Sequence, residues 1–450
     1  MYSRIFTALL VLVSLAPLPL GGNRPLPWSL MAMLVGVLLI VWSSTVIAKK
    51  ETHLVFIKGV WVCVVLFVLA SLWAALQTSS VLPESWSHPL WNESSKALGE
   101  PLTGYISLDT FKSSTALMRL LSYGGVFWIS LQLCRSSRRA RLMYLTLASA
   151  GFVYASYGLI VYLGKFNTIL WYEKWAYLDD LTSVFVNRNS FATYAGLTLI
   201  CAIAIFMDDL IKERSFGFSN KYTIRVLLEK LSKRWWIYLI LIFTVTTALL
   251  LSHSRGGLIS AISGIVIFFL VLAGAESRER WKVSIVLIIF AIMGAVFSIS
   301  GQGTVNRMYS ALSDAKIRQN FNEQSMQAIT AEPWLGYGYG TYENVAPMFR
   351  DDIFHPFVLA AHNTYLENIM DLGTPAALAL FLSIGGLGLI CLRGVFTRRR
   401  NVVYPCAGLA ATALISVHSL VDFSLQMPAV AITYSAIMGV ACAQSFSSSK

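Results

Sequence analysis

Long uninterrupted apolar runs constrain this chain more than any other feature. They recur along the sequence at about 16–23 residues each, a length that lets an α-helix cross a bilayer. The strands of a membrane β-barrel would instead show alternating segments of about 10 residues. Hydrophobic residues make up 56% of the 450 residues and charged residues only 13%, so a soluble domain could not bury this apolar surface. The sequence therefore predicts an all-α polytopic membrane protein.

We expect about twelve transmembrane helices, with a large loop between the ninth and the tenth. The predicted ranges are 5–20, 26–48, 54–76, 116–134, 142–164, 189–207, 235–252, 256–274, 283–300, 374–392, 402–418 and 427–445. Residues 1–22 resemble a signal peptide, with Arg4 before an apolar run. The many later spans favour a first transmembrane helix instead.

The basic residues predict the orientation of the chain. Most of the 35 Lys and Arg residues fall in every second connecting segment, including the dense clusters RSSRRAR at 135–141 and RGVFTRRR at 393–400. Short loops rich in Lys and Arg remain on the cytoplasmic side of a membrane. We therefore expect both termini to be cytoplasmic. This distribution also accounts for the formal charge of +12, so we expect no nucleic-acid partner.

Three longer segments then fall on the outer side, at 77–115, 165–188 and 301–373. The last is the large loop, with a helical pattern near 314–330 followed by a stretch rich in Gly, Pro and Tyr. Loops of this length in a compact protein usually carry function. We expect the working surface of the protein on this side.

Two arginines stand where predicted helices begin on the outer side. Arg255, in SHSRGG at 252–257, precedes the span 256–274, and Arg188, in NRNS at 187–190, precedes the span 189–207. A helix start presents unpaired N–H groups and a partial positive charge, and a guanidinium matches phosphate oxygens. Together the two arginines predict a clamp for a diphosphate. The alternative for each is an interfacial arginine that contacts lipid headgroups.

His362 is the third candidate on the outer side, just before the span 374–392. A histidine can accept the proton of a sugar hydroxyl or orient that hydroxyl. Asn363 and Glu367 are near it in sequence, and Glu367 comes closest to its face on a helix. A loop histidine bonded to a backbone carbonyl is the alternative. We expect His253 to be structural, and His355 and His418 are weaker candidates.

Other motifs argue against further chemistry. The GYGYG of 336–340 follows no strand and precedes no Walker lysine, so a turn that exposes aromatic side chains is the better interpretation. Tyr339 and its neighbours could stack on sugar rings. The chain has no HExxH motif or acidic metal-binding cluster, so we expect no metal and no cofactor. The six cysteines fall in or beside apolar runs, as expected of small buried hydrophobic residues.

The chain resembles the bacterial O-antigen ligase and O-antigen polymerase family. The similarity is carried by SHSRGG at 252–257, by IRQNFNEQSMQAITAEPWLGYGYGTYEN at 317–344, by the segment from His362, and by HSLVDFSLQMPA at 418–429. The histidine motif of the ligases is similar to H-[NSQ], then nine residues, then G-x-x-x-[GTY]. Here Gly373 follows His362-Asn363 at that spacing, but the last position is Ala377, so polymerase remains open beside ligase.

The resemblance implies a GT-C-like helical membrane glycosyltransferase with a periplasmic catalytic loop. Its catalytic region would be 235–445, after N-terminal transmembrane helices in 1–234. Arg255 and His362 match family positions that bind the lipid diphosphate and act on the acceptor, Arg318 fits a position often occupied by arginine, and Asn363 belongs to the motif. The implied donor is an undecaprenyl-diphosphate-linked glycan in the lipid bilayer, and the acceptor is lipid A–core or another polysaccharide.

Transport is the alternative class, as a lipid-linked oligosaccharide flippase or secondary carrier. Coupled carriers usually place ionisable residues within their spans. Here charge is concentrated on one face, and the spans carry charge only near their ends, as at Lys58 and Arg119. A peptidoglycan polymerase is a further alternative, and its acidic catalytic residue could be Asp351 or Asp352. The distribution of charge favours glycan transfer at the outer surface.

Overall fold

The computed structural model confirms an all-α polytopic protein. It describes residues 2–48, 57–214, 235–275, 319–350, 360–398 and 400–446. The helices within these ranges are α1 (Tyr2–Leu15), α2 (Pro25–Ala48), α3 (Trp61–Leu76), α4 (Pro89–Leu98), α5 (Thr110–Leu133), α6 (Ser137–Leu163), α7 (Arg188–Arg214), α9 (Trp236–Leu251), α10 (Arg255–Ala275), α13 (Tyr342–Val345), α14 (Thr364–Leu372), α15 (Thr374–Thr397), α16 (Val403–His418) and α17 (Pro428–Ser445). Short 3₁₀ segments are η1 (Leu20–Gly22), η3 (Glu84–Trp86), η5 (Ala346–Phe349) and η6 (Ser424–Gln426).

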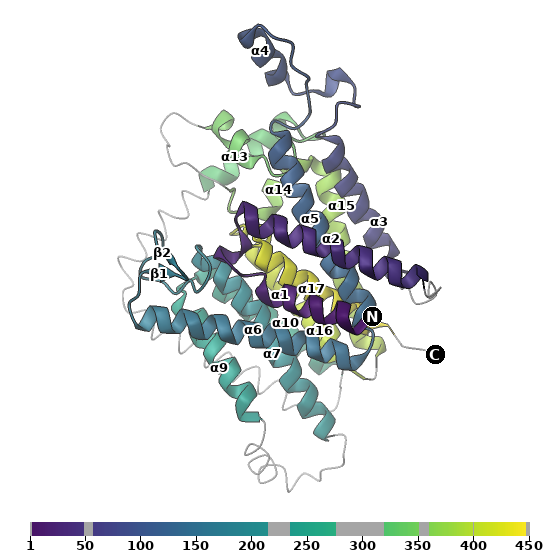
Figure 1. The fold of residues 1–450 in the computed structure, drawn as a ribbon, viewed down its shortest axis with the longest axis vertical. Coiled ribbons are helices and arrows are strands. Elements are labelled where there is room, and N and C mark those ends of the chain that lie inside the picture. The colour runs from purple at the N-terminus through teal and green to yellow at the C-terminus, as the bar shows by residue number, and fades with distance from the viewer. Residues whose placement is uncertain are drawn as a thin grey trace.

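Extended structure is minor in the described part of the chain. The two strands β1 (Thr168–Ile169) and β2 (Tyr172–Glu173) form one small antiparallel hairpin, with Thr168 opposite Glu173. This hairpin lies beside the start of α7 (Figure 1). It shapes the outer segment 165–188 that the sequence predicts.

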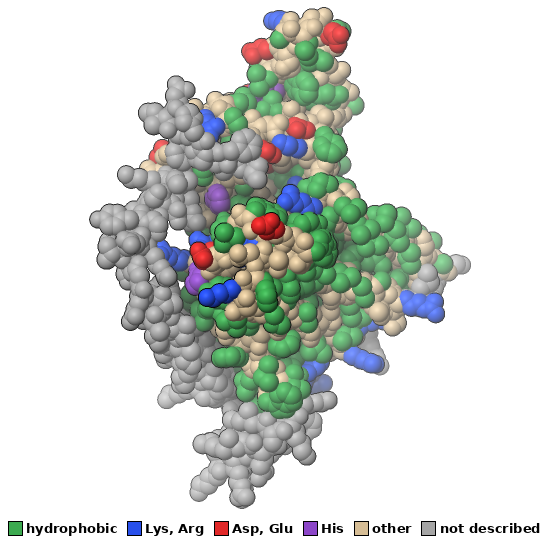
Figure 2. Space-filling model, turned by 60° about the vertical axis from the view of Figure 1, so that its left-hand side comes forward, with side chains coloured by type: hydrophobic (Ala, Val, Ile, Leu, Met, Phe, Trp, Pro, Cys, Tyr) green, Lys and Arg blue, Asp and Glu red, His purple; other side chains and the backbone are tan. Residues whose placement is uncertain are grey.

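The helices fall where the apolar runs predict them. Within the described residues, seven helices are long and apolar enough to cross a membrane, namely α2, α5, α6, α7, α10, α15 and α17, and four shorter apolar helices are α1, α3, α9 and α16. The predicted ninth span, 283–300, lies outside the described residues. Figure 2 shows the broad hydrophobic surface that these helices present, with charged side chains gathered mainly toward its edges. A bilayer is the solvent that matches such a surface.

The first predicted span, 5–20, is wrong at its C-terminal end. Helix α1 ends at Leu15, and a turn and the 3₁₀ segment η1 follow. Pro17 and Pro19 explain the difference, because proline lacks the backbone N–H and its ring clashes with the preceding helical turn.

Two central helices organise the bundle. Helices α7 and α17 are almost completely buried, with α17 packed on α5 and α16, and α7 packed on α6, α10 and α16. Small residues permit this close packing, as is common between membrane helices. A Cβ atom at Gly439 of α17 would lie 2.6 Å from the carbonyl oxygen of Phe127 in α5.

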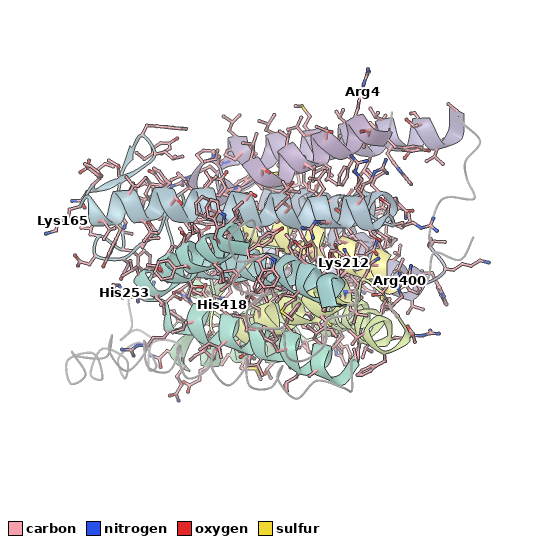
Figure 3. The ribbon with its side chains drawn as sticks, turned by 90° about the horizontal axis from the view of Figure 1, so that it is seen from below. Arg4, Lys165, Lys212, His253, Arg400 and His418 are labelled. Atoms are coloured by element: carbon pink, nitrogen blue, oxygen red, sulfur yellow. The ribbon has the colours of Figure 1, made fainter. Side chains whose placement is uncertain are left out.

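The helix ends lie where the predicted orientation requires. Those predicted on one side of the membrane lie at one end of the bundle. Figure 3 shows Lys165 and His253 toward one end, and Arg4, Lys212 and Arg400 toward the other. The predicted outer loops also have structure of their own. Helix α4 projects from the body beyond the ends of α3 and α5 (Figure 1), and residues 319–331 are helical, in agreement with the pattern near 314–330.

The packing of α17 on α5 leads to a stability prediction. Gly439→Ala places a methyl group against the α5 backbone and should destabilise the protein by about 1–3 kcal/mol, a usual cost of overpacking. Gly36→Ala in α2 is the matched control, because no heavy atom lies within 4 Å of the added Cβ. Thermal unfolding in nanodiscs should show a lower midpoint for the first variant only. Equal midpoints would contradict the close approach of these helices.

Candidate active site

Helices α7 and α10 begin at the same place. The side chain of Asn187 accepts the backbone N–H of Asn189 at 2.7 Å, and the hydroxyl of Ser254 accepts that of Gly257 at 3.1 Å, so each helix has a side-chain cap. The Ser254 hydroxyl also donates to the Asn189 side chain at 2.8 Å. The two helix starts predicted as an anion site are thus joined by a direct hydrogen bond.

Asp422 connects this pair to α14. Its carboxylate accepts a short hydrogen bond from the Asn189 amide, and its backbone carbonyl accepts from the Thr364 hydroxyl at 2.9 Å. The Thr364 backbone N–H donates to the Ser419 carbonyl at 2.9 Å. Asp422 is buried, at 1% exposure, so these contacts are shielded from water. Segments far apart in sequence therefore meet at one site, formed by the starts of α7, α10 and α14 and by residues 419–423.

Arg255 is the available cation of this site. It is the first residue of α10, its side chain is exposed, and it has no hydrogen-bond or ion-pair partner within the described ranges. The start of α10 adds its own partial positive charge. An exposed guanidinium at a helix start can bind an anion without first breaking an ion pair.

Arg188 differs from Arg255 in that it is already paired. Its guanidinium donates to the Asp180 carboxylate at 2.7 Å and lies 5.3 Å from the ring centre of Tyr177. The other oxygen of Asp180 lies 2.9 Å from Nδ1 of His253. Burial raises the pKa of Asp180, but the hydrogen bond with His253 and the charge of Arg188 outweigh it and hold this pKa below its ordinary value. The positive charge of Arg188 is therefore shared with Asp180, which distinguishes it from Arg255, and the two-arginine clamp for a diphosphate stays a prediction.

His362 lies just before α14, in a left-handed backbone conformation with φ of 52°. Its ring packs edge-on against Phe423, with centres 5.0 Å apart, and parallel to Phe321 at 6.2 Å. Phe423 follows Asp422, so His362 sits beside the joined helix starts. Asn363 is the cap of α14, since its side-chain oxygen accepts the backbone N–H groups of Tyr365 and Leu366. The Asn363 side-chain oxygen therefore has a structural role as a helix cap.

Glu367 holds the backbone that carries His362. Its carboxylate accepts the N–H of Ala361 at 2.9 Å, and its side chain is 5% exposed. Burial raises the pKa of Glu367 to about 7, although the Ala361 N–H and the charge of Arg119 oppose this rise. The sequence placed Glu367 on the face of His362, whereas the structure has Glu367 bound to the residue before it.

A cavity of about 1020 Å³ lies next to these groups. Asn187 and Ser190 line it from α7, Thr364 lines it from α14, and Phe423 lines it from the segment after α16. Tyr339 also lines it, and its backbone N–H donates to the Gln77 side chain at 3.1 Å. A cavity of this volume can hold several sugar rings or a comparable ligand.

The glycine-rich stretch before α13 forms a tight turn. Gly336, Gly338 and Gly340 all have positive φ, and a Cβ at Gly336 would meet the backbone of Asp371 and Gly373 at about 2.5 Å. The predicted turn is present, but the prediction that it exposes its aromatic side chains is wrong for Tyr337 and Tyr342, because the turn packs against α14 and Ser107. Tyr337 is buried in it, at 1% exposure.

Some predicted residues are not described. Arg318, His355, Asp351 and Asp352 lie outside the described residues. In the part of the chain that is described, no group of three or more His, Cys, Asp or Glu side chains is placed to hold a metal ion.

Three residues that build the site have no distinctive local signal. Asp180 is one of two aspartates in an aromatic loop, Asn189 is one of four polar residues in NRNS, and Asp422 is the one acidic residue of HSLVDFSLQMPA. Only the passage HSLVDFSLQMPA draws attention to Asp422, through the family resemblance. Asp180 and His253 are 73 residues apart in sequence, and Asn189 and Asp422 are farther apart still. No periodic pattern in the sequence therefore reveals these contacts.

The pairing of Asp180 leads to a prediction. Asp180→Asn keeps the shape of the side chain and removes the charge that holds Arg188 and His253, so the midpoint of thermal unfolding should fall, by the equivalent of about 1–3 kcal/mol. The exposed neighbour Asp179→Asn is the control and should have no effect. A double variant with Arg188→Gln should recover part of the loss. A fall of the same size in both aspartate variants would contradict the pairing.

The raised pKa of Glu367 predicts a dependence of stability on pH. The folded protein binds this proton more tightly than the unfolded chain, so stability should fall as pH rises from about 4.5 to 7, as the buried carboxyl ionises. Glu367→Gln stays neutral and removes this contribution. Thermal midpoints measured between pH 5 and pH 8 should decline more steeply for the unsubstituted protein. Parallel curves would mean that Glu367 titrates at its ordinary pKa.

Comparison with known proteins now gives the family of this region. A search of curated proteins found no match. Residues 239–381 match the family model described as O-antigen ligase. The match runs from α9 into α15 and includes Arg255, His362, Asn363, Glu367 and Tyr339, whereas Arg188, Asn189 and Asp422 lie outside it. The match supports the resemblance inferred from the sequence, and residues 239–381 of this chain are similar to the O-antigen ligase family.

Proposed function

We propose that this protein is a membrane glycosyltransferase that moves a glycan from undecaprenyl diphosphate to a saccharide acceptor at the outer face of the bacterial inner membrane. The observation that carries this proposal is that hydrogen bonds link three helix starts beside a cavity, with the exposed Arg255 as the first residue of α10 and His362 just before α14. The family match supports the same class of reaction. The acceptor is lipid A–core for a ligase, or another lipid-linked chain for a polymerase.

Arg255 has the chemistry to stabilise the leaving group. When the bond between the anomeric carbon and the diphosphate oxygen breaks, its electron pair remains on the diphosphate and adds negative charge there. An exposed guanidinium at the start of α10 is preorganised to receive that charge. Arg188 adds less, because Asp180 already binds it at 2.7 Å. Its contribution is to fix the start of α7 and the caps around it.

His362 has the chemistry to handle the acceptor. The acceptor hydroxyl oxygen forms the new bond to the anomeric carbon, and its proton passes to the imidazole. The diphosphate is a good leaving group, so orientation of the hydroxyl matters more than strength of the base. The packing of the His362 ring against Phe423 and Phe321, together with the Glu367 bond to Ala361, limits the positions that the ring can take.

The role of Arg255 is tested by substitution. Arg255→Gln should lower the rate of transfer by about 10²–10³, the usual loss when one donor to a developing anion is removed. Arg255→Lys should recover part of the rate, because a lysine keeps the charge but not the fork of donors. Lys165→Gln removes an exposed cation at the same end of the molecule and is the control.

The measurement uses purified protein in liposomes, with the lipid-linked donor and the acceptor in the same leaflet. Donor and product are separated by gel electrophoresis. A rate for Arg255→Gln equal to that of Lys165→Gln would remove Arg255 from the reaction. Absence of transfer by the unsubstituted protein with every acceptor tested would count against the proposed function itself.

The orientation predicts a labelling pattern. All six cysteines are buried, so an introduced cysteine can be followed against a low background. With an impermeant thiol reagent and a permeabilised outer membrane, Lys165→Cys should be labelled in whole cells and Arg400→Cys only after the inner membrane is breached. Both side chains are exposed, so access to them differs by side and not by burial. The reverse pattern would place the site in the cytoplasm.

A further inference from the structure

One part of the cavity is lined by four polar groups, of which the proposed chemistry uses only Glu367, through its bond to Ala361. Arg119 and Tyr123 come from α5, and Glu367 and Asp371 come from α14. The two carboxyl groups are one helical turn apart and are both buried, at 5% and 2% exposure. Arg119 lies 4.9 Å from the ring centre of Trp28, which also lines the cavity.

Two of these groups have polar atoms without a partner. One Asp371 oxygen accepts the Gly340 N–H at 2.7 Å, but the other, Oδ1, has no hydrogen bond within the described residues. The same holds for the buried hydroxyl of Tyr123. An unsatisfied buried polar atom costs about 1–3 kcal/mol, so native proteins seldom keep one without a use. Both residues line the cavity, so a ligand in it can supply the missing partners.

The mixture of charges narrows the class of ligand. A phosphate or diphosphate needs several cationic or N–H donors, whereas these four residues include one arginine beside two carboxyl groups. A lipid chain would leave all of these polar atoms unpaired. Sugar hydroxyls both donate and accept hydrogen bonds, so they match an arginine, a tyrosine hydroxyl and carboxyl groups at once. Aromatic rings such as Trp28 and Tyr339 supply flat apolar surfaces for sugar rings.

The cavity leads from these groups to the proposed reaction site. Asn187 and Ser190, in the first turn of α7, line it, as do Thr364 and Phe423 beside His362. A diphosphate bound at the starts of α7 and α10 would therefore lie beside this cavity, within reach of its sugar. We propose that Arg119, Tyr123, Glu367 and Asp371 form a binding site for the saccharide part of the lipid-linked glycan. This inference rests on the proposed function and adds to it the residues that recognise the sugar.

Binding to the full chain in nanodiscs tests this site. The probes are undecaprenyl diphosphate without sugar, and the lipid-linked glycan extracted from cells that lack this protein. Asp371→Asn and Arg119→Gln should each weaken binding of the lipid-linked glycan at least tenfold and leave binding of undecaprenyl diphosphate within about twofold of the unsubstituted protein. Asp179→Asn and Lys165→Gln, both exposed, are the controls and should change neither affinity. Thermal midpoints identify any variant that fails to fold. If Asp371→Asn or Arg119→Gln fails to fold, the affinities of the folded variant of the two test the site.

The outcomes separate the two proposals. Unchanged affinity for the glycan in a folded Asp371→Asn or Arg119→Gln protein would overturn the saccharide site and leave the proposed function standing. Equal weakening for both probes would assign these residues to the diphosphate or the lipid and would also overturn the site. If the unsubstituted protein bound neither probe, the proposed function would fail together with this inference.

Discussion

The hydrogen bonds of one side chain, Asn189, hold the proposed site together. Asn189 accepts from Ser254 at 2.8 Å and donates to Asp422, whose carbonyl in turn binds Thr364 at 2.9 Å. In a bilayer every backbone polar group must find a partner, and helix starts are where N–H groups remain unpaired. Caps and short polar side chains satisfy some of them here. The N–H groups that stay unpaired lie at three helix starts at one end of the bundle, where an anion can be bound.

The two arginines at these helix starts have different roles because of one aspartate. Asp180 binds Arg188 and His253, so it links the loop before α7 to the turn before α10, and its negative charge faces that of Arg188. Arg255 has no such partner among the described residues. Among the described residues at these helix starts, Arg255 is thus the guanidinium without an ion-pair partner, as expected of the proposed diphosphate site. A frame of linked helix starts keeps the catalytic groups in place without help from the substrate.

Much of the fold could be predicted from the sequence, but the site only in part. The apolar runs predict the helices, because a membrane span must be long and uncharged. The Ser-Arg-Gly-Gly break predicts the start of α10. The end of α1 was missed, although Pro17 and Pro19 explain it. The links of Asp180 to His253 and of Asn189 to Asp422 could not be predicted, because they join segments that only the packing of the bundle brings together. The burial of Asp371 next to a cavity could not be predicted either, because the sequence of α14 has the pattern of an ordinary amphipathic helix.

The central claim is that Arg255 and His362 act on one substrate in one step. Rates of transfer by purified protein in liposomes, for Arg255→Gln, His362→Ala and the double variant, test it most directly. Groups that serve the same transition state are not additive, so the double variant should be about as slow as the slower single variant. Losses that multiply, so that the double variant is slower by the product of both factors, would show that the two residues act independently and would contradict the account.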